Sequence, residues 1–240
     1  VLLPVGCGTW STHIMAVAKT LLPLPNEADP LQLAMMTVNP PTASLMLSEF
    51  VDLEQGEWVI QNVANSGVGT YLIQLAKVRG LKTVNVVRRE SAIASVLETG
   101  GDVVLVDGPD LAKRVKEATD GAKIRLAIDA VGGKSTEHLA MCLTQSGVLV
   151  NYGAMSGEPC QISPASFVFR DITLRGFWLS QWFQNASPEK RMVVFGEVAK
   201  LISMGKLKSR VQATYSIDQI KEAVKVAASG ERDGKILIVP

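Results

Sequence analysis

The chain has few of the residues that build metal centres or disulfide frameworks. Its 240 residues include only three cysteines and two histidines. Cys7, Cys142 and Cys160 are sparse and odd in number, which argues against a disulfide framework and favours a reducing compartment. Without a Cys-x-x-Cys pair, Cys7 and His13 fall short of the ligands that zinc needs, so we expect no metal. No local Ser-His-Asp pattern surrounds His13 or His138, so we expect both to be structural or surface residues.

An excess of charge and a long apolar run are missing as well. The 24 basic and 23 acidic residues leave a net charge of +1. This balance gives no electrostatic reason to expect nucleic acid or an anionic membrane as a partner. No apolar run reaches the roughly 18 residues of a membrane helix, and the N-terminus has no signal-peptide pattern. The chain starts without Met, inside a strand-like Val1-Leu2-Leu3-Pro4, so we expect its natural beginning to lie upstream.

From Trp58 onward the chain alternates regularly between apolar strands and helices. Hydrophobic residues make up 47% of the chain, which is enough for a large core. We predict strands at 58–62, 83–87, 102–106, 125–129, 147–152 and 171–177, and helices at 68–78, 91–99 (with Ser91 as N-cap), 111–119 and 135–143. Such an alternation indicates a parallel sheet covered on both faces. The fold class is therefore α/β, with a doubly wound parallel Rossmann sheet.

The two ends of the chain depart from this alternation. Residues 1–30 contain short apolar pieces broken by glycine and proline, and residues 34–51 are predicted to be helical with a break at 39–41. After the sixth strand we predict helices at 188–204 and 217–228 and a closing strand at 235–240. We expect this tail to pack with residues 1–30, so that a small domain is split around the large one.

The turn after the first strand has the sequence Ala64-Asn65-Ser66-Gly67-Val68-Gly69. It resembles the dinucleotide fingerprint G-x-G-x-x-G, with Ala64 and Ser66 in place of the first two glycines. Gly67 and Gly69 keep the backbone open for a pyrophosphate, and the helix N-terminus supplies N–H groups and partial positive charge. The turn therefore predicts a nucleotide site, and a tight turn that binds no nucleotide remains the alternative.

The end of the second strand, about 20 residues further on, distinguishes NAD from NADP. Here the chain has Val87-Arg88-Arg89 rather than an acidic residue. Two guanidinium groups can bind a 2′-phosphate through bidentate hydrogen bonds, which points to NADPH. A pair of solvated arginines is the alternative, and Glu90, which follows directly, leaves NAD open.

Three later segments could complete such a site. Residues 129–133 and 151–154 end the fourth and fifth strands at the carboxyl edge of the sheet, where ligands of such sheets bind. Gly132, Gly133 and Gly153 would admit a nucleotide close to the backbone, or they are ordinary turn glycines. Residues 175–182 form the densest aromatic segment of a chain with 5% aromatic residues. They could enclose a nicotinamide and an acyl chain, or serve core and interdomain packing.

Together these residues resemble the medium-chain dehydrogenase/reductase superfamily, and within it the zinc-free reductases of the mitochondrial trans-2-enoyl-CoA or enoyl-[acyl-carrier-protein] type. The resemblance covers essentially the whole chain. It rests on Gly8-Thr9-Trp10, Val38-Asn39-Pro40, the stretch from Gln61 to Gly69, Asn85-Val86-Val87-Arg88, Val131-Gly132-Gly133-Lys134-Ser135, and the stretch from Leu174 to Trp182. The turn at 65–69 and the segment 175–182 separate this type from generic quinone reductases.

The resemblance implies a function and a set of contacts. Such enzymes use NADPH to reduce the 2,3 double bond of an enoyl-CoA or enoyl-ACP thioester in fatty acid synthesis. The implied cofactor contacts are Asn39, Asn65, Ser66, Gly67, Val68, Arg88, Arg89, Glu90, Tyr152, Gly153, Ala154, Met155, Phe177, Trp178, Leu179, Ser180 and Lys235. Trp182 is implied in the substrate site.

The resemblance also implies a domain plan. Residues 1–39 would be the remnant of a GroES-like, β-rich catalytic domain, residues 40–178 the NADP-binding Rossmann domain, and residues 179–240 a return segment that packs with the catalytic domain. The catalytic tyrosine of the family is expected upstream of Val1, because Tyr71, Tyr152 and Tyr215 are not at matching positions. We therefore predict no catalytic residue within this chain.

Pairing, location and two other functions complete the prediction. The family implies a homodimer through the edge strand at 171–177, in the mitochondrial matrix if the source is eukaryotic and in the cytoplasm if it is bacterial. Two alternatives remain open. One is an NADPH-dependent quinone or alkenal reductase of the same superfamily, and the other is a truncated, non-catalytic NADPH-binding module.

Overall fold

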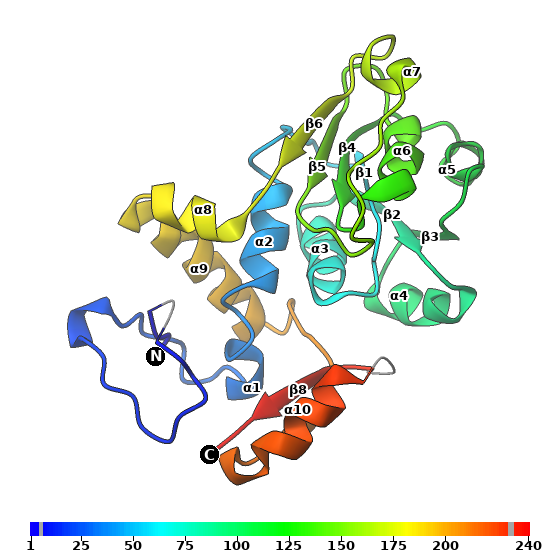
Figure 1. The fold of residues 1–240 in the computed structure, drawn as a ribbon. Helices are drawn as coiled ribbons and strands as arrows, with labels where there is room; N and C mark the ends of the chain where they lie inside the picture. Colours follow the sequence, from blue (N-terminus) through cyan, green and yellow to red (C-terminus); the bar gives the residue numbers. More distant parts are fainter. Residues whose placement is uncertain (5–6, 230–232) are drawn as a thin grey trace. The chain divides into compact units, whose positions relative to one another are not determined.

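The computed structural model describes residues 1–4, 7–229 and 233–240 (Figure 1). The chain divides into two compact units. The larger unit is Val38–Val194, and the smaller unit combines Val1–Thr37 with Phe195–Pro240. We describe each unit by itself.

The larger unit is built on a six-stranded parallel sheet with the strand order β3-β2-β1-β4-β5-β6. Its strands are β1 Trp58–Gln61, β2 Lys82–Val87, β3 Val103–Val106, β4 Ile124–Asp129, β5 Val148–Asn151 and β6 Thr173–Gly176. The order runs outward in both directions from β1 and β4, which defines the doubly wound topology. The predicted Rossmann-like sheet is confirmed.

Helices cover both faces of this sheet (Figure 1). The covering helices are α3 Gly67–Val78, α4 Ile93–Thr99, α5 Leu111–Ala118 and α6 Gly133–Cys142. The unit also contains α2 Asn39–Met46, α7 Pro164–Phe167, α8 Leu179–Asn185 and the start of α9 Pro188–Ser203. On one face, Ile73 of α3 and Val96 of α4 pack against Val87. On the other, Leu111 of α5 and Leu139 of α6 pack against Ile60 and Val84. The two apolar layers explain why the central strands are buried on both sides.

Several predicted details are wrong. Ser91 does not cap α4, because it lies in a short 3-10 turn, η2 Glu90–Ala92, and α4 begins at Ile93 without a side-chain cap. Residues 34–38 are turns rather than helix, so residues 39–41 interrupt no helix; Pro40 and Pro41 lie instead in the first turn of α2, where proline is suited because it needs no N–H partner. The helices α7 and α8 were not predicted. They are only 4 and 7 residues long, too short for a clear helical period.

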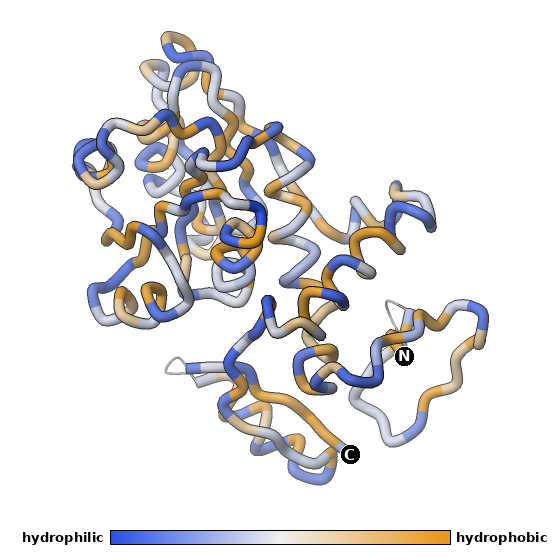
Figure 2. Tube along the Cα trace, turned by 180° about the vertical axis from the view of Figure 1, so that it is seen from behind, coloured by the Kyte–Doolittle hydropathy of each residue, from blue (hydrophilic) through white to orange (hydrophobic). Residues whose placement is uncertain are grey.

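The smaller unit contains a two-stranded parallel sheet, β7 Val211–Tyr215 with β8 Lys235–Ile238. The 3-10 turn η3 Ile217–Gln219 and the helix α10 Ile220–Ala228 connect the two strands. After Lys235 the strand β8 is apolar, and it is orange beside the C-terminus in Figure 2. The sequence predicted β8 but missed β7, in which polar residues alternate with apolar ones.

The N-terminal segment joins this unit through α1 Pro30–Leu33, which follows the 3-10 turn η1 Ala18–Thr20. Gln32 is buried and exchanges two hydrogen bonds with the backbone of Ser209, at 3.0 and 2.8 Å. The strand predicted at residues 1–4 is reduced to one antiparallel bridge between Leu2 and Leu22. A two-stranded sheet does not identify a GroES-like domain, so that assignment remains a prediction.

None of the helices within the described residues combines the length and the apolar character that crossing a bilayer requires.

Candidate cofactor site

The turn between β1 and α3 is organised by a serine cap. Ser66 has extended backbone angles, and its Oγ accepts a hydrogen bond from the Gly69 N–H at 3.1 Å. A Cβ built on Gly69 would lie 2.4 Å from the carbonyl oxygen of Ala64, so this position needs glycine. Ser66 thus satisfies a helix N–H group where the common fingerprint has a second glycine. The turn therefore has glycine at position 69, where close packing requires it, and a capping side chain at position 66.

The same turn holds a backbone outlier. Val63 has φ +49°, a conformation that β-branched residues rarely adopt. It is held by hydrogen bonds on both sides, from Ser66 N to the Val63 oxygen at 2.9 Å and from Ala64 N to the Val86 oxygen at 3.2 Å. Such strain collects at binding and catalytic sites, where the surrounding structure maintains it.

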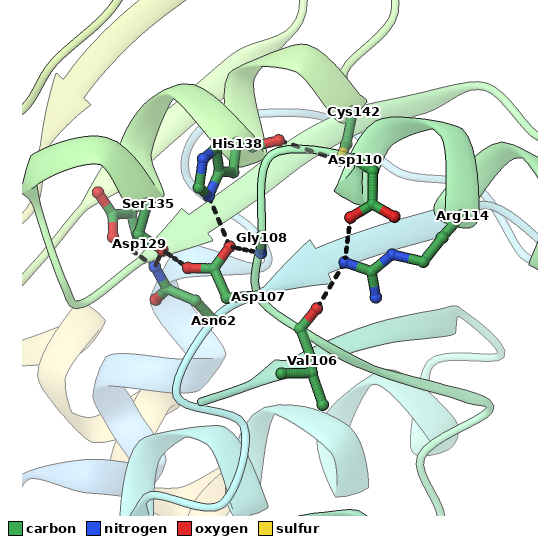
Figure 3. Close-up of polar contacts among 10 residues, drawn as sticks. All are labelled: Asn62, Val106, Asp107, Gly108, Asp110, Arg114, Asp129, Ser135, His138 and Cys142. Carbon is green, nitrogen blue, oxygen red and sulfur yellow. Dashed lines mark hydrogen bonds and ion pairs between the residues drawn. The ribbon is translucent and has the colours of Figure 1, made fainter. Parts of the chain in front are cut away.

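A group of polar side chains, which we call the carboxyl-edge network, joins the carboxyl ends of β1, β3, β4 and β5. Its members are Asn62, Asp107, Asp129, Ser135, Thr136, His138 and Asn151. Figure 3 draws Asn62, Asp107, Asp129, Ser135 and His138 of this network. Asn62 donates to Asp129 Oδ1 at 2.6 Å and to Ser135 Oγ at 3.1 Å, and its own oxygen accepts from the Ala130 N–H at 2.8 Å. The residue that precedes the strained turn is therefore fixed on three sides.

Asp129 is the fully buried centre of this network. Besides Asn62, its carboxylate accepts from the side chains of Thr136 at 2.7 Å and Asn151 at 3.1 Å. The backbone N–H groups of Val131 and Gly132 donate to it at 2.8 and 3.2 Å. Five donors compensate for the loss of hydration that burial of a carboxylate requires. We conclude that Asp129 holds the edge together and is not offered to a ligand.

Arg88 and Arg89 follow the last residue of β2 and are exposed to solvent. Neither guanidinium makes an ion pair or hydrogen bond with any residue that the structure describes. Glu90 begins η2 directly after them. The pair is therefore placed, and left available, at the sheet edge that also carries the glycine turn.

Tyr152 lies at the end of β5, beside the turn. Burial raises the pKa of its phenol to about 12, and a hydrogen bond with Ser66 acts in the opposite direction. The Tyr152 N–H donates to the backbone carbonyl oxygen of Asp129 at 2.9 Å, and the Met155 N–H donates to that of Ala130 at 3.0 Å. The segment of predicted contacts from Tyr152 to Met155 is thus folded against the end of β4.

The glycines of this edge are required by the chain's own packing. A Cβ on Gly153 would lie 2.9 Å from the Ala130 oxygen. Gly132 and Gly133 have positive φ values of +78° and +56°, and a Cβ on either would meet Glu158 at 2.8 or 2.7 Å. For Gly132 and Gly133 the turn interpretation is therefore favoured over access for a nucleotide. The contact predicted for Gly153 remains a prediction.

The predicted aromatic segment is spread over a strand end and a helix. The Phe177 N–H donates to the Asn151 oxygen at 2.9 Å, and the ring packs edge-on against Phe50, with centroids 6.0 Å apart. Trp178 is 67% exposed. Leu179 and Ser180 begin α8, and Trp182 packs against Phe183. The structure thus places these residues after β6 without gathering them around one point.

Two other predicted contacts lie elsewhere. Asn39 is the first residue of α2, which packs against α3. Lys235 begins β8 in the smaller unit. As for metals, no group of three His, Cys, Asp or Glu side chains within residues 1–4, 7–229 and 233–240 could hold an ion.

The sequence did not single out the carboxyl-edge network as a unit. A signal was present, because Asn62, Asp107, Asp129 and Asn151 each stand at or just after the end of an apolar strand. Parallel strands bring such positions to one edge. His138, expected to be structural or superficial, is half-buried, and its Nδ1 lies 2.8 Å from Asp107 Oδ1.

Known proteins are similar to this chain over most of its length. Residues 67–195 match the family model of the zinc-binding dehydrogenases. A mitochondrial enoyl-[acyl-carrier-protein] reductase of Caenorhabditis elegans is 36% identical over 229 residues, covering 93% of this chain and 65% of that protein. Its counterpart in Dictyostelium discoideum is 36% identical over 239 residues, covering 96% of this chain and 67% of that protein. The chain thus spans about two thirds of the length of these relatives.

Solved structures share the fold. A mutant enoyl thioester reductase from Candida tropicalis has 28% identity and a TM-score of 0.86, covering 97% of this chain and 71% of its own. A Bacillus thuringiensis protein assigned as an NADPH:quinone reductase has 28% identity and a TM-score of 0.85, covering 95% of this chain and 70% of its own. Another mutant, solved with NADP and crotonyl-CoA, has 27% identity and a TM-score of 0.84, covering 93% and 69%. The chain belongs to the zinc-binding dehydrogenase family, within the medium-chain dehydrogenase/reductase superfamily.

Proposed function

We propose that this chain serves the NADPH-dependent reduction of the 2,3 double bond of a trans-2-enoyl thioester, an enoyl-CoA or enoyl-ACP, in fatty acid synthesis. The observation that carries the proposal is the Ser66-capped turn at the start of α3, beside two arginines without partners in the described chain. The relatives named above, at 36% identity, supply the substrate class.

The cofactor fits the residues of this edge. The N–H groups at the start of α3 and the glycine backbone suit a pyrophosphate, and Arg88 and Arg89 suit a 2′-phosphate. The other proposed contacts are Asn39, Asn65, Val68, Glu90, Tyr152, Gly153, Ala154, Met155, Phe177, Trp178, Leu179, Ser180 and Lys235, with Trp182 near the substrate. When bound, NADPH supplies the hydride. The chain's part is to hold the nicotinamide in one orientation against the alkene.

The proton that completes the reduction needs a donor near the α-carbon. Tyr152 is unsuited to that role, because its phenol is hydrogen-bonded to Ser66 and its pKa is raised to about 12. Tyr71 lies fully buried in α3. We therefore propose that the donor is a tyrosine outside these 240 residues, as the family resemblance implies.

The first test measures NADP⁺ binding by calorimetry and NADPH oxidation with crotonyl-CoA. We expect the chain to bind NADP⁺ and to gain crotonyl-CoA reduction when it is extended with upstream coding sequence. If the chain binds NADP⁺ but the extended protein reduces nothing, the non-catalytic binding module is correct instead. Failure of both proteins to bind NADP⁺ would overturn every version of the proposal.

A quinone reductase is the second candidate, because the Bacillus thuringiensis structure is as similar to this chain as the enoyl thioester reductase structure. The two activities use the same cofactor and differ in the acceptor. NADPH oxidation with crotonyl-CoA should exceed that with a simple benzoquinone at equal concentration. The reverse order would favour the quinone or alkenal reductase.

We further propose that two copies pair through β6. This strand is the last of the sheet, and all four of its residues are exposed. An open strand edge is a template for pairing with a second chain. For location, we propose the mitochondrial matrix if the source is eukaryotic and the cytoplasm if it is bacterial.

A further inference from the structure

The carboxyl-edge network brings a histidine–carboxylate pair next to the arginines. Val87 of β2 and Val106 of β3 are paired in register, so Arg88 and Asp107 are the next residues along the two strands. The Asp107 N–H also donates to the Val87 oxygen at 2.9 Å. The carboxylate of Asp107 is 27% exposed. A negative charge therefore lies beside the position proposed for the 2′-phosphate of the cofactor.

The geometry of Asp107 is fixed from three directions (Figure 3). Ser135 donates to Oδ2 at 2.7 Å, and the Gly108 N–H donates to Oδ1 at 2.8 Å. His138 Nδ1 lies 2.8 Å from Oδ1. Ser135 in turn accepts from Asn62, the residue before the glycine turn. The histidine–carboxylate pair is thus connected to the glycine turn, proposed for the pyrophosphate, and lies next to the arginines, proposed for the 2′-phosphate.

The other groups around the pair keep a constant charge at ordinary pH. Arg114 forms an ion pair with Asp110 at 3.0 Å and donates a hydrogen bond to the backbone carbonyl of Val106 at 2.8 Å. Arg170 donates to the carbonyls of Ala140 and Met141, both at 3.3 Å. Cys142 stays neutral, because burial and the charge of Asp107 raise its pKa to about 12. Arginine is always charged, whereas histidine changes its charge between about pH 5 and 8.

We propose that His138 is a positioning residue that sets the preference for NADP over NAD by neutralising Asp107 beside the 2′-phosphate. This inference rests on the proposed cofactor and adds a determinant other than the two arginines. With His138 neutral, the carboxylate repels the phosphate. With His138 protonated, the ion pair removes most of that repulsion and holds the turn in place. The preference for NADP should therefore weaken as the pH rises.

The variant that tests this is His138→Asn. Asparagine can place an N–H donor near the position of Nδ1 but takes up no proton. NADP⁺ and NAD⁺ dissociation constants would be measured by calorimetry at pH 5.5 and pH 8.5, and the NAD⁺/NADP⁺ ratio of the two constants compared. A phosphate monoester itself titrates near pH 6, so the difference between variant and wild type is the measured quantity.

At pH 5.5 we expect the ratio of the NAD⁺ to the NADP⁺ dissociation constant to be about fivefold higher for the wild type than for His138→Asn. At pH 8.5 the two proteins should have the same ratio. His13→Asn, the same change in the smaller unit, should keep the wild-type profile. Asp107→Asn should show the same dependence on pH as His138→Asn, which is that of the phosphate alone, and it keeps the inference testable if His138→Asn unfolds. Equal ratios for the wild type and His138→Asn at pH 5.5, with NADP⁺ still bound, would overturn this inference alone. If the wild type binds neither nucleotide, the proposed function itself fails.

Discussion

Replacing Gly69 with alanine should damage both the stability and the cofactor site of the larger unit. The new methyl group would lie 2.4 Å from the Ala64 oxygen and 2.7 Å from its carbonyl carbon. These atoms belong to the backbone, so no side chain can move to relieve the contact. The start of α3 must shift instead, and the hydrogen bonds that Gly69 makes with Ser66 at 3.1 Å and Gln61 at 3.2 Å would weaken.

The expected magnitude is the balance of two effects. Overpacking against rigid atoms costs about 3 kcal/mol, at the upper end of its usual range. Alanine is favoured over glycine in a helix by about 1 kcal/mol. Gly69→Ala should therefore lower the free energy of unfolding by about 2 kcal/mol. The affinity for NADP⁺ should fall too, because the displaced N–H groups are those proposed for the pyrophosphate.

Urea unfolding followed by circular dichroism, with calorimetric titration of NADP⁺, measures both effects. Gly176→Ala is the matched control, since a Cβ on Gly176 meets nothing within 4 Å and the residue lies in the same unit. The control should unfold at the same urea concentration as the wild type or slightly above it. If Gly69→Ala proves as stable as Gly176→Ala and binds NADP⁺ equally well, the argument about this turn is wrong.

Four further predictions follow from the larger unit. Arg88→Ala combined with Arg89→Ala should weaken NADP⁺ binding by about 100-fold and NAD⁺ binding by less than about threefold in calorimetry; equal losses would contradict a 2′-phosphate site. Asp129→Ala leaves five donors unsatisfied, three from side chains and two from backbone N–H groups, and should cost about 4 kcal/mol in urea unfolding. Leu174→Lys should convert a dimer into a monomer in light scattering, and a wild type that is already monomeric would refute pairing through β6. Because burial raises the pKa of Cys142 to about 12, iodoacetamide at pH 8 should modify it at least about 100-fold more slowly in the native than in the unfolded protein, as mass spectrometry would detect.

The sheet could be predicted from the sequence because its strands are apolar on both faces. Strands such as Val103–Val106 are uninterrupted apolar runs between helices, a pattern typical of a parallel sheet that is covered on both sides. The missed elements have the opposite character. The strand β7 has only partly buried residues alternating with exposed ones, and α8 has no fully buried residue. Where little apolar surface is buried, the periodic signal is weak.

From the sequence, the candidate site could be predicted only at positions where the backbone conformation requires a particular type of residue. The need for glycine at position 69 and for a capping side chain at position 66 is a local property, readable from a turn placed between a strand and a helix. The hydrogen bonds of Asp107 connect it to Ser135 and His138, which lie 28 and 31 residues further along the chain. No local pattern encodes such partners, because the packing of α6 against the sheet brings them together.

Asp107 and Asp129 show how one sheet edge can contain both a fixed and an adjustable charge. Asp129 is fully buried, and its donors are neutral amide, hydroxyl and N–H groups that do not titrate near neutral pH. Asp107 is partly exposed, and one of its partners is a histidine. The surroundings of Asp129 thus carry no group that changes its charge near neutral pH, whereas Asp107 has the histidine on which our proposal rests. Asn62 and Ser135 link the two carboxylates through hydrogen bonds, and this chain of contacts connects Asp107 to the residues that precede the glycine turn. The proposed adjustable charge beside the 2′-phosphate can thus coexist with a turn whose own hydrogen bonds do not depend on pH.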